Sequence, residues 1–378
     1  MTGRGDGVST ILCVAGARPN FVKIAPILRQ MGEHPALRGF LVHTGQHYDT
    51  AMSDGFFADL RIPAPDVSLG VGSASHAVQT AEIMRGFEPV VDEVAPAAVL
   101  VVGDVNSTVA AALVAAKKHV PVVHVEAGLR SFDRAMPEEI NRLVTDQLSD
   151  LLFTTEPSGR ENLLREGVED SRICFVGNVM IDTLVEALPR AVPADETLGG
   201  LAVNGTALEA AKGFGLVTLH RPSNVDEPAR LSRYLSVLAE ISQDLPLVFP
   251  VHPRTRARAE AAGFDPAKSA GRLLFTEPMS YLAFLGLTRD ARLVITDSGG
   301  LQEETTFLGV PCITARDNTE RPVTIDQGTN VLIGADPDKL LAEARRVLAG
   351  GRGEARVPAL WDGKAARRII EELARRYA

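Results

Sequence analysis

Carboxylate side chains follow two apolar, β-branched runs in the first half of the sequence. Asp104 comes shortly after the run 98–102, and Glu126 comes directly after the run 120–125. Glu138 opens a helical pattern further along the chain. Carboxylates that share a partly desolvated site can divide the roles of general acid and general base. We therefore take all three as candidate catalytic groups, against the simpler alternative that they cap helices or complement helix dipoles.

Basic side chains occupy comparable positions. Arg18 and Lys23 follow the apolar run 11–15 and lie at the start of an expected helix, while His220 follows the run 215–219. Open α/β sheets bind ligands at the carboxyl ends of their strands, so these cations are placed to meet an anionic ligand. The alternative is a solvated surface pair for Arg18 and Lys23, and a structural histidine for His220.

A glycine pair marks a third candidate site. Ser298, Gly299 and Gly300 follow the run 293–296 and precede a helical pattern. Glycines let backbone N–H groups approach an anion, and a helix N-terminus adds positive potential. Glu304, one turn into that helix, can offer a carboxylate to ribose hydroxyls. The sequence thus predicts a diphosphate-binding turn, with an ordinary capped strand-to-helix turn as the alternative.

Several cofactor chemistries leave no trace in the sequence. No G-x-G-x-x-G motif opens a strand–helix–strand unit, and no G-x-S-x-G nucleophile elbow is present. No set of His, Cys, Asp or Glu has the spacing of a zinc or magnesium site. We expect no nicotinamide, no metal and no other cofactor.

Apolar runs alternate with amphipathic helical patterns from end to end, which is typical of parallel sheets built from βαβ units. Expected strands cover residues 11–15, 40–43, 98–102, 120–125, 173–176, 215–219, 247–251, 272–275, 293–296, 311–314 and 330–333. Helical patterns include residues 22–31, 107–118 and 137–150. The stretch 187–205 is rich in proline, glycine and alanine, which indicates a linker or surface excursion between two halves.

The bulk composition narrows the class of protein. A chain of 378 residues exceeds one ordinary core and suits two α/β domains. The net charge of −9 argues against nucleic acid or an anionic membrane as partner. Cys13, Cys174 and Cys312 each lie in or beside an apolar run, which indicates reduced, buried thiols. With a polar first ten residues and no long apolar stretch, we expect a cytoplasmic protein with no signal peptide.

Taken together, the motifs resemble the non-hydrolysing UDP-N-acetylglucosamine 2-epimerase family along nearly the whole chain. The matching stretches are GARPNFVKIAPI (16–27), TGQH (44–47), VGDVNST (102–108), HVEAGLRS (124–131), PEEINR (137–142), GNVMIDTL (177–184), TLHRPSN (218–224), PVHP (250–253), DSGGLQEE (297–304) and TERP (319–322). Each stretch is short, but ten of them in the same order are highly specific.

The resemblance implies a fold and a division of labour. The fold is α/β, with two Rossmann-like domains in a GT-B arrangement and the active site in the interdomain cleft. The N-terminal domain, 1–185, would carry the catalytic acids, and helix 362–378 would pack back on it. The C-terminal domain, 206–360, would bind UDP. The resemblance also implies a homodimer that acts on a UDP-sugar.

Residue roles carry over by motif position. The resemblance gives catalytic positions to Asp104, Glu126, Glu138, Lys23 and His220. It gives substrate-binding positions to Arg18, Arg142, Ser298, Gly299, Gly300 and Glu304. Among these, Ser298 and Gly299 would hold the diphosphate and Glu304 the ribose hydroxyls.

The chemistry of the family agrees with the residues. A base removes the C2 proton of a UDP-2-acetamido sugar while UDP leaves from C1 in an anti elimination, which gives a 2-acetamidoglucal. UDP then adds back, and a proton returns to the opposite face of C2. This route needs acids and bases on both faces of C2 and cations at the departing diphosphate, but no redox cofactor.

Alternatives within and beyond the family stay open. The chain carries Tyr48, Asp49 and Pro222 where other members have an Arg-Glu pair and an arginine, so activation by a second substrate molecule is in doubt. The stretch SFDRAMPEEINR (131–142) resembles a branch that includes epimerases of UDP-2,3-diacetamido uronates. Other rivals are a hydrolysing 2-epimerase, a GT-B glycosyltransferase and a catalytically silent sugar-nucleotide sensor.

Overall fold

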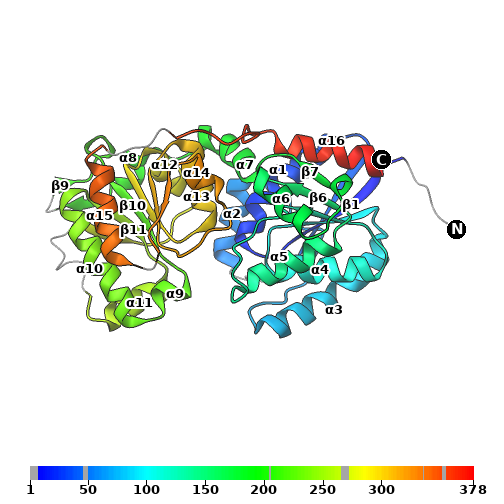
Figure 1. The fold of residues 1–378 in the computed structure, drawn as a ribbon, viewed down its shortest axis with the longest axis horizontal. Coiled ribbons are helices and arrows are strands. Elements are labelled where there is room, and N and C mark those ends of the chain that lie inside the picture. The colour runs from blue at the N-terminus through cyan, green and yellow to red at the C-terminus, as the bar shows by residue number, and fades with distance from the viewer. Residues whose placement is uncertain (1–6, 46–49, 204–205, 265–271, 335, 351–354) are drawn as a thin grey trace. The chain divides into compact units, whose positions relative to one another are not determined.

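Two parallel sheets, each covered by helices, make up the computed structural model, which describes residues 7–45, 50–203, 206–264, 272–334, 336–350 and 355–378 (Figure 1). The chain divides into two compact units. Unit 1 consists of Met1–Glu186 and Ala359–Ala378, and unit 2 of Ala187–Pro358.

Unit 1 is built on seven strands in the order β3-β2-β1-β4-β5-β6-β7, all parallel. Its strands are β1 (Ser9–Ala15), β2 (Leu37–His43), β3 (Val67–Ser68), β4 (Ala98–Val102), β5 (Val122–Val125), β6 (Leu151–Thr154) and β7 (Ile173–Phe175). Its helices are α1 (Arg18–Gly32), α2 (Thr50–Leu60), α3 (His76–Val94), α4 (Asn106–Lys117), α5 (Pro137–Leu148), α6 (Pro157–Arg165), α7 (Val179–Ala187) and α16 (Ala365–Tyr377).

Unit 2 repeats the plan with six parallel strands in the order β12-β11-β10-β13-β14-β15. The strands are β10 (Gly215–Thr218), β11 (Leu247–Pro250), β12 (Leu273–Thr276), β13 (Leu293–Thr296), β14 (Cys312–Thr314) and β15 (Asn330–Leu332). The helices are α8 (Ala194–Leu198), α9 (Pro222–Val225), α10 (Pro228–Asp244), α11 (Pro253–Ala261), α12 (Tyr281–Asp290), α13 (Gly299–Leu308), α14 (Val323–Asp326) and α15 (Pro337–Leu348). A short antiparallel pair, β8 (Ala202–Val203) and β9 (Thr206–Ala207), precedes the sheet.

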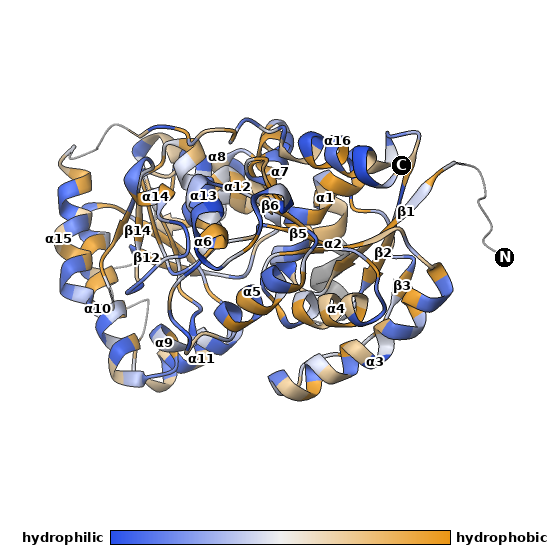
Figure 2. Ribbon diagram, turned by 45° about the vertical axis from the view of Figure 1, so that its right-hand side comes forward, coloured by the Kyte–Doolittle hydropathy of each residue, from blue (hydrophilic) through white to orange (hydrophobic). Residues whose placement is uncertain are grey.

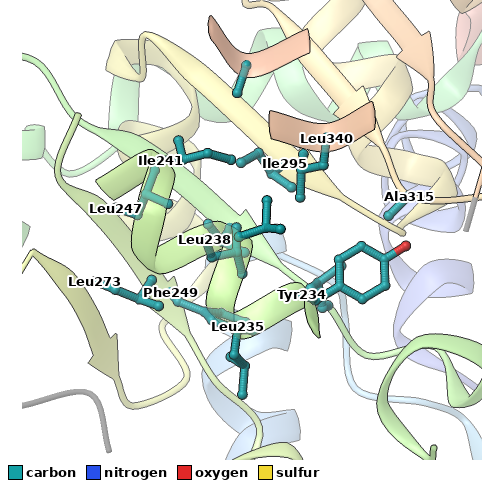
Figure 3. Packing of buried hydrophobic residues seen from close by; sticks show 14 of the residues in the cluster. Tyr234, Leu235, Leu238, Ile241, Leu247, Phe249, Leu273, Ile295, Ala315 and Leu340 are labelled. Atoms are coloured by element: carbon teal, nitrogen blue, oxygen red, sulfur yellow. The ribbon is translucent and has the colours of Figure 1, made fainter. Parts of the chain in front are cut away.

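Alternate residues along the strands of unit 2 supply two separate apolar cores, because successive side chains of a strand point to opposite faces. Val217 and Ile295 pack on one face with residues of α10 and α15, while Leu216 and Val294 pack on the other with residues of α8, α12 and α13. Figure 3 shows the first of these cores, with the α10 side chains directed at the strands. In Figure 2, α15 and α16 are apolar along one side and hydrophilic along the other, which explains why they lie on the surface of their units.

The C-terminal helix belongs to unit 1. Figure 1 shows α16 beside α1, and the two helices pack together. Asp182 of α7 accepts hydrogen bonds from the backbone N–H groups of Ala365 and Ala366, at 3.1 and 2.7 Å, and so caps the start of α16. Trp361, which precedes the helix, is buried and donates its indole N–H to the Thr155 carbonyl at 3.0 Å.

All eleven expected strands are present, with ends shifted by a few residues. Four further strands in the described part of the chain, β3, β6, β8 and β9, were not expected. The structure also corrects the linker predicted over 187–205, because α8 and β8 form there and Leu198 is fully buried in a core of unit 2. Of the three cysteines, Cys13 and Cys312 are buried and Cys174 is partly exposed, and all three lie on strands.

Candidate active site

In both sheets the strand order reverses beside the first strand, between β1 and β4 in unit 1 and between β10 and β13 in unit 2. Neighbouring strand-to-helix connections leave such a point in opposite directions, so the carboxyl ends of the two strands are open to a ligand. The candidate residues follow these four strands and β5. Because the two units are separate bodies, the candidate residues form two sets, one in each unit.

Asn20 joins the two turns at the reversal point of unit 1. Its side-chain oxygen accepts hydrogen bonds from the N–H groups of Gly16 and Ala17, both at 3.1 Å, and its amide donates to the Val102 carbonyl at 2.9 Å. Gly16 is required here, since a Cβ atom would lie 2.1 Å from the Ser107 hydroxyl. Asn20 was not predicted as a site residue, because a buried asparagine in a turn has no sequence signature of its own.

Lys23 and Glu126 form a buried ion pair beside this turn, with Nζ 2.6 Å from Oε2. Glu126 directly follows β5 and has φ of 73°, in the left-handed region that disfavours any residue with a Cβ. Such strain persists where the surrounding structure enforces it, and it clusters at functional sites. Both partners were predicted as catalytic, and the structure brings them into contact.

Asp104 forms a second ion pair, with Arg142 of α5. Arg142 Nη1 lies 2.5 Å from Asp104 Oδ2, and its Nη2 lies 2.8 Å from Glu139. Glu139 also accepts from the backbone N–H groups of Ser131 and Phe132, each at 3.0 Å. The guanidinium is therefore held between two carboxylates, and Glu139 fixes the orientation in which Arg142 meets Asp104.

Asp104 and Glu126 were expected to share a site as a carboxylate pair. In the structure each is bound to its own cation, Glu126 to Lys23 and Asp104 to Arg142. Gly103 has φ of 65°, and a Cβ atom there would lie 2.9 Å from Lys23 Nζ. The glycine thus lets the Lys23 ammonium approach the backbone of the residue that precedes Asp104.

His124 of β5 contacts the backbone of this turn. Its Nε2 lies 2.8 Å from the Gly103 carbonyl and its Nδ1 lies 2.6 Å from Asp146, and all of these groups are buried. Burial alone would raise the pKa of Asp146, but His124 and Arg130 outweigh it and hold that pKa below its usual value. Arg130 Nη2 is 2.7 Å from Asp146. These three buried residues position the site, and sequence analysis did not single them out.

Two predicted residues of unit 1 lie outside the ion pairs. Glu138 is half-buried at the first turn of α5 and lines a pocket of about 250 Å³. Arg18 is exposed at the start of α1, with its guanidinium carbon 5.4 Å from the centre of the Phe56 ring. Tyr48 and Asp49, which depart from the family pattern, lie outside the described residues.

In unit 2, Asp297 organises the reversal point. It is fully buried and accepts from the backbone N–H groups of His220 and Arg221 and from the Asn224 amide, at 2.9–3.2 Å. Its Oδ1 is 3.0 Å from His220 Nδ1, while the His220 side chain is 57% exposed. Burial would raise the pKa of Asp297, but the contacts with His220 and the N–H donors lower it, so the carboxylate stays charged and fixes the imidazole.

Ser298 is the N-cap of α13, and Gly299 and Gly300 form its first turn. The Ser298 N–H bonds to the Thr296 hydroxyl at 2.9 Å, whereas its side chain makes no capping bond. A Cβ atom on Gly299 would lie 2.7 Å from Arg321 Nη1. The helix start therefore packs against Arg321, and glycine leaves room for this close approach.

Glu303 and Glu304 have different environments. Glu303 is fully buried, and its Oε1 lies 2.9 Å from Arg321 Nε. Glu304 accepts a hydrogen bond from the Tyr281 hydroxyl at 3.3 Å. Burial raises the pKa of Glu304 to about 7, with a smaller increase from the charge of Glu303 and a partial offset from Tyr281. The charge of Glu304 therefore changes near neutral pH.

Within the described part of the chain, no group of three or more His, Cys, Asp or Glu side chains is arranged to hold a metal ion. Over the same residues, no helix combines the length and apolar character needed to cross a membrane.

Comparison with known proteins places these residues in a family context. Residues 29–374 match the family model described as UDP-N-acetylglucosamine 2-epimerase. The UDP-N-acetylglucosamine 2-epimerase of Methanocaldococcus jannaschii is 40% identical over 95% of this chain and 97% of its own length. The UDP-2,3-diacetamido-2,3-dideoxy-D-glucuronate 2-epimerase of Pseudomonas aeruginosa is 41% identical over 97% of this chain and 99% of its own.

A solved structure is similar over the same span. The crystal structure of the M. jannaschii UDP-GlcNAc 2-epimerase in complex with UDP-GlcNAc and UDP superimposes with a TM-score of 0.87, at 38% identity, over 97% of this chain and 99% of that one. The prediction of two Rossmann-like domains of the GT-B class is confirmed by this match and by the strand orders of the two sheets.

Proposed function

The chain belongs to the UDP-N-acetylglucosamine 2-epimerase family, and we propose that it inverts carbon 2 of a UDP-linked 2-acetamido sugar. UDP-N-acetylglucosamine and UDP-N-acetylmannosamine are the proposed pair. The protein is thus an isomerase of nucleotide sugars. In the proposed division of labour, unit 2 holds the UDP group and unit 1 acts on the sugar.

The observation that best supports this proposal is the pair of ion pairs around Gly103. Lys23 holds Glu126 and Arg142 holds Asp104, so each carboxylate is kept in a defined orientation by a nearly buried cation. Epimerisation requires one group to take a proton from C2 and another to deliver a proton to the opposite face. Two separately oriented carboxylates at the edge of one sheet meet that requirement.

In the forward step, the C2–H and C1–O bonds break and a C1=C2 double bond forms, which gives a 2-acetamidoglucal and UDP. The proton passes to Asp104, Glu126 or Glu138, and the electron pair of the C1–O bond leaves with the diphosphate. In the return step, UDP re-adds at C1 and C2 receives a proton on its other face. Atoms and electrons balance without a redox cofactor.

Unit 2 supplies the groups that suit the leaving diphosphate. The backbone N–H groups at the start of α13, beside Ser298 and Gly299, offer donors and positive potential to an anion. His220 is exposed and fixed by Asp297 at the neighbouring strand end, which suits it to the developing charge. Glu304 is the proposed acceptor for the ribose hydroxyls.

A second substrate is supported by a specific similarity. The P. aeruginosa relative, named as an epimerase of UDP-2,3-diacetamido-2,3-dideoxy-D-glucuronate, is as similar to this chain as the relatives named for UDP-N-acetylglucosamine. Both substrates carry the 2-acetamido group and UDP, so the mechanism is common to them. Turnover of the two compounds, measured side by side, identifies the preferred one.

The oligomeric state, the compartment and the partners of the enzyme are also proposed. We infer a homodimer, as the family resemblance implies, and a cytoplasmic enzyme that binds no nucleic acid, as the composition indicates. The net charge of −9 supports the absence of a nucleic-acid partner. Light scattering of the purified protein measures the oligomeric state directly.

The roles of the carboxylates can be tested by isosteric substitution. We expect Asp104→Asn and Glu126→Gln each to lower kcat by at least about a hundredfold, the usual scale for loss of a general acid or base. The dissociation constant for UDP, measured by calorimetry, should stay unchanged, because UDP is assigned to unit 2. Glu161→Gln, an exposed position on α6, is the matched control and should retain full activity.

One result would contradict the catalytic roles of Asp104 and Glu126. If UDP affinity collapses in Asp104→Asn or Glu126→Gln while the rate per bound substrate is normal, these residues bind the nucleotide and do not catalyse. Thermal unfolding of each variant separates either outcome from simple loss of folding.

A further inference from the structure

A pocket in unit 1 is formed by the start of α3 with the loop before it and by the first turns of α4 and α5. Its volume is about 250 Å³, and Glu138 lies in its wall. The three elements all belong to unit 1, so the pocket is complete within one unit. The catalytic scheme above uses Glu138 but assigns nothing to the cavity beside it.

Three residues with neutral amide side chains, Gln79, Asn106 and Asn141, line the pocket and are linked by hydrogen bonds. Gln79 donates to the Gly72 carbonyl at 2.8 Å, and Asn106 donates to the Gln79 side-chain oxygen at 2.8 Å. Asn106 also contacts His76 Nδ1, at 3.1 Å from its nitrogen. Gln79 and Asn106 are buried, so these contacts hold their amides in fixed orientations.

The chain of amides ends at the ion pairs. Asn141 donates to the side-chain oxygen of Asn106 at 3.3 Å and to the backbone carbonyl of Asp104 at 2.9 Å. Asn141 itself lines the pocket, one turn after Glu138 on α5. These hydrogen bonds therefore fix the position of the pocket relative to Glu138 and Asp104, two of the three candidate catalytic carboxylates.

The lining excludes an anion and favours a small neutral amide. The residues that line it include no lysine or arginine, and their one charged side chain is Glu138, so a phosphate or carboxylate would be repelled. Ala74, Val105 and Pro137 add apolar surface to the lining. An N-acetyl group needs this combination, since it has one N–H, one C=O and one methyl.

On the basis of the proposed function, we propose that this pocket receives the 2-acetamido group of the sugar. The acetamido nitrogen is bonded to C2, the carbon whose proton the carboxylates exchange. A pocket that shares Glu138 with the catalytic set therefore lies next to the reacting carbon. Seating the acetamido group there orients C2 toward Glu138 and Asp104 and sets the specificity for 2-acetamido sugars.

The test fills the pocket from its rim. Ala74→Trp places an indole at the exposed edge of the lining, and Ala77→Trp, on the first turn of α3 and outside the lining, is the matched control. With UDP-N-acetylglucosamine as substrate, Ala74→Trp should lower kcat/KM at least tenfold, whereas Ala77→Trp should match the wild type. The UDP dissociation constant should be the same in all three proteins.

Each other outcome has a defined meaning. Wild-type kcat/KM in Ala74→Trp, an equal loss in Ala77→Trp, or loss of UDP binding in Ala74→Trp overturns the assignment of the pocket. A wild-type protein that fails to exchange the C2 proton of any UDP-2-acetamido sugar contradicts the proposed function itself. The two failures are thus distinguishable within one set of measurements.

Discussion

Glu126 is held at this site by its backbone conformation, its burial and its ion pair. Its backbone is held at φ of 73°, its side chain is buried, and Lys23 supplies the compensating charge. A buried carboxylate without that lysine would be strongly destabilising, so the pair has to be kept as a unit. The sequence identifies both members through their motifs, but only the fold shows that they contact each other.

Glu304 gives a pH-dependent prediction at the same scale. Burial raises its pKa to about 7, so the ionised fraction grows from about one tenth to about nine tenths between pH 6 and pH 8. The ionised form accepts the ribose hydroxyls better, so the affinity for UDP should increase up to about tenfold over this range. At pH 8, Glu304→Gln should weaken UDP binding by about 1.5–3 kcal/mol.

Calorimetric titration with UDP at each pH measures the affinity of the wild type and of Glu304→Gln. The terminal phosphate of UDP titrates in the same range, but it does so for both proteins and cancels in the ratio of their affinities. Parallel pH profiles for the wild type and Glu304→Gln would show that Glu304 does not contact the nucleotide in its ionised form.

At the level of elements, the apolar runs predict the sheets well, because the central strands, such as β1, β4 and β13, are buried apolar segments flanked by turns. The strand β6 was missed because only Ser149 and Asp150 separate it from the helix before it, which leaves no visible turn. The sequence predicts a linker over 187–205 because proline, glycine and alanine are frequent there. Its apolar residues Ala194 and Leu198 nevertheless belong to a core that local sequence cannot reveal.

The candidate site also contains residues that the sequence predicts and residues that it does not. Strand ends and glycine turns can be read from the sequence, so Asp104, Lys23 and the α13 turn are predictable. Their buried supports are not, because the partners of Asn20, His124 and Asp297 come from other strands and helices. Long-range hydrogen bonds of this kind depend on the order of the strands, which motif spacing does not encode.

The link between α7 and α16 yields a stability prediction. The pKa of Asp182 is raised to about 6, because burial outweighs the N–H groups of Ala366 and Ala365 that favour the charged form. A raised folded-state pKa stabilises the protein below the unfolded value of about 3.9, and the contribution is lost as pH rises through 6. Relative to Asp182→Asn, the wild type should therefore lose up to about 3 kcal/mol of unfolding free energy between pH 4 and pH 7.

Trp361 provides the probe for this measurement. It is the only tryptophan in the sequence and is buried in unit 1, so its fluorescence during urea unfolding reports on the unit that contains Asp182. Glu161→Gln is the control and should follow the wild type at every pH. An unfolding free energy of Asp182→Asn that tracks the wild type across the range would rule out a charge-dependent role for Asp182.

For the molecule as a whole, two Rossmann-like units divide the substrate between them in the proposed function. Each sheet offers one reversal point, and the polar side chains gathered there differ in kind. Unit 1 presents carboxylates paired with cations, whereas unit 2 presents a helix start, an exposed histidine and a buried carboxylate. A nucleotide sugar has two parts that match these two sets, a C2–H bond beside a leaving group and an anionic diphosphate.

Epimerisation by proton exchange at C2 is the central claim, and incubation with UDP-N-acetylglucosamine in heavy water tests it most directly. The account predicts UDP-N-acetylmannosamine with deuterium at C2, read by proton NMR, at a rate that added nicotinamide cofactor does not change. Release of free N-acetylmannosamine would identify a hydrolysing enzyme. An epimerised product that quantitatively keeps its C2 proton would contradict the elimination mechanism and the roles given to Asp104, Glu126 and Glu138.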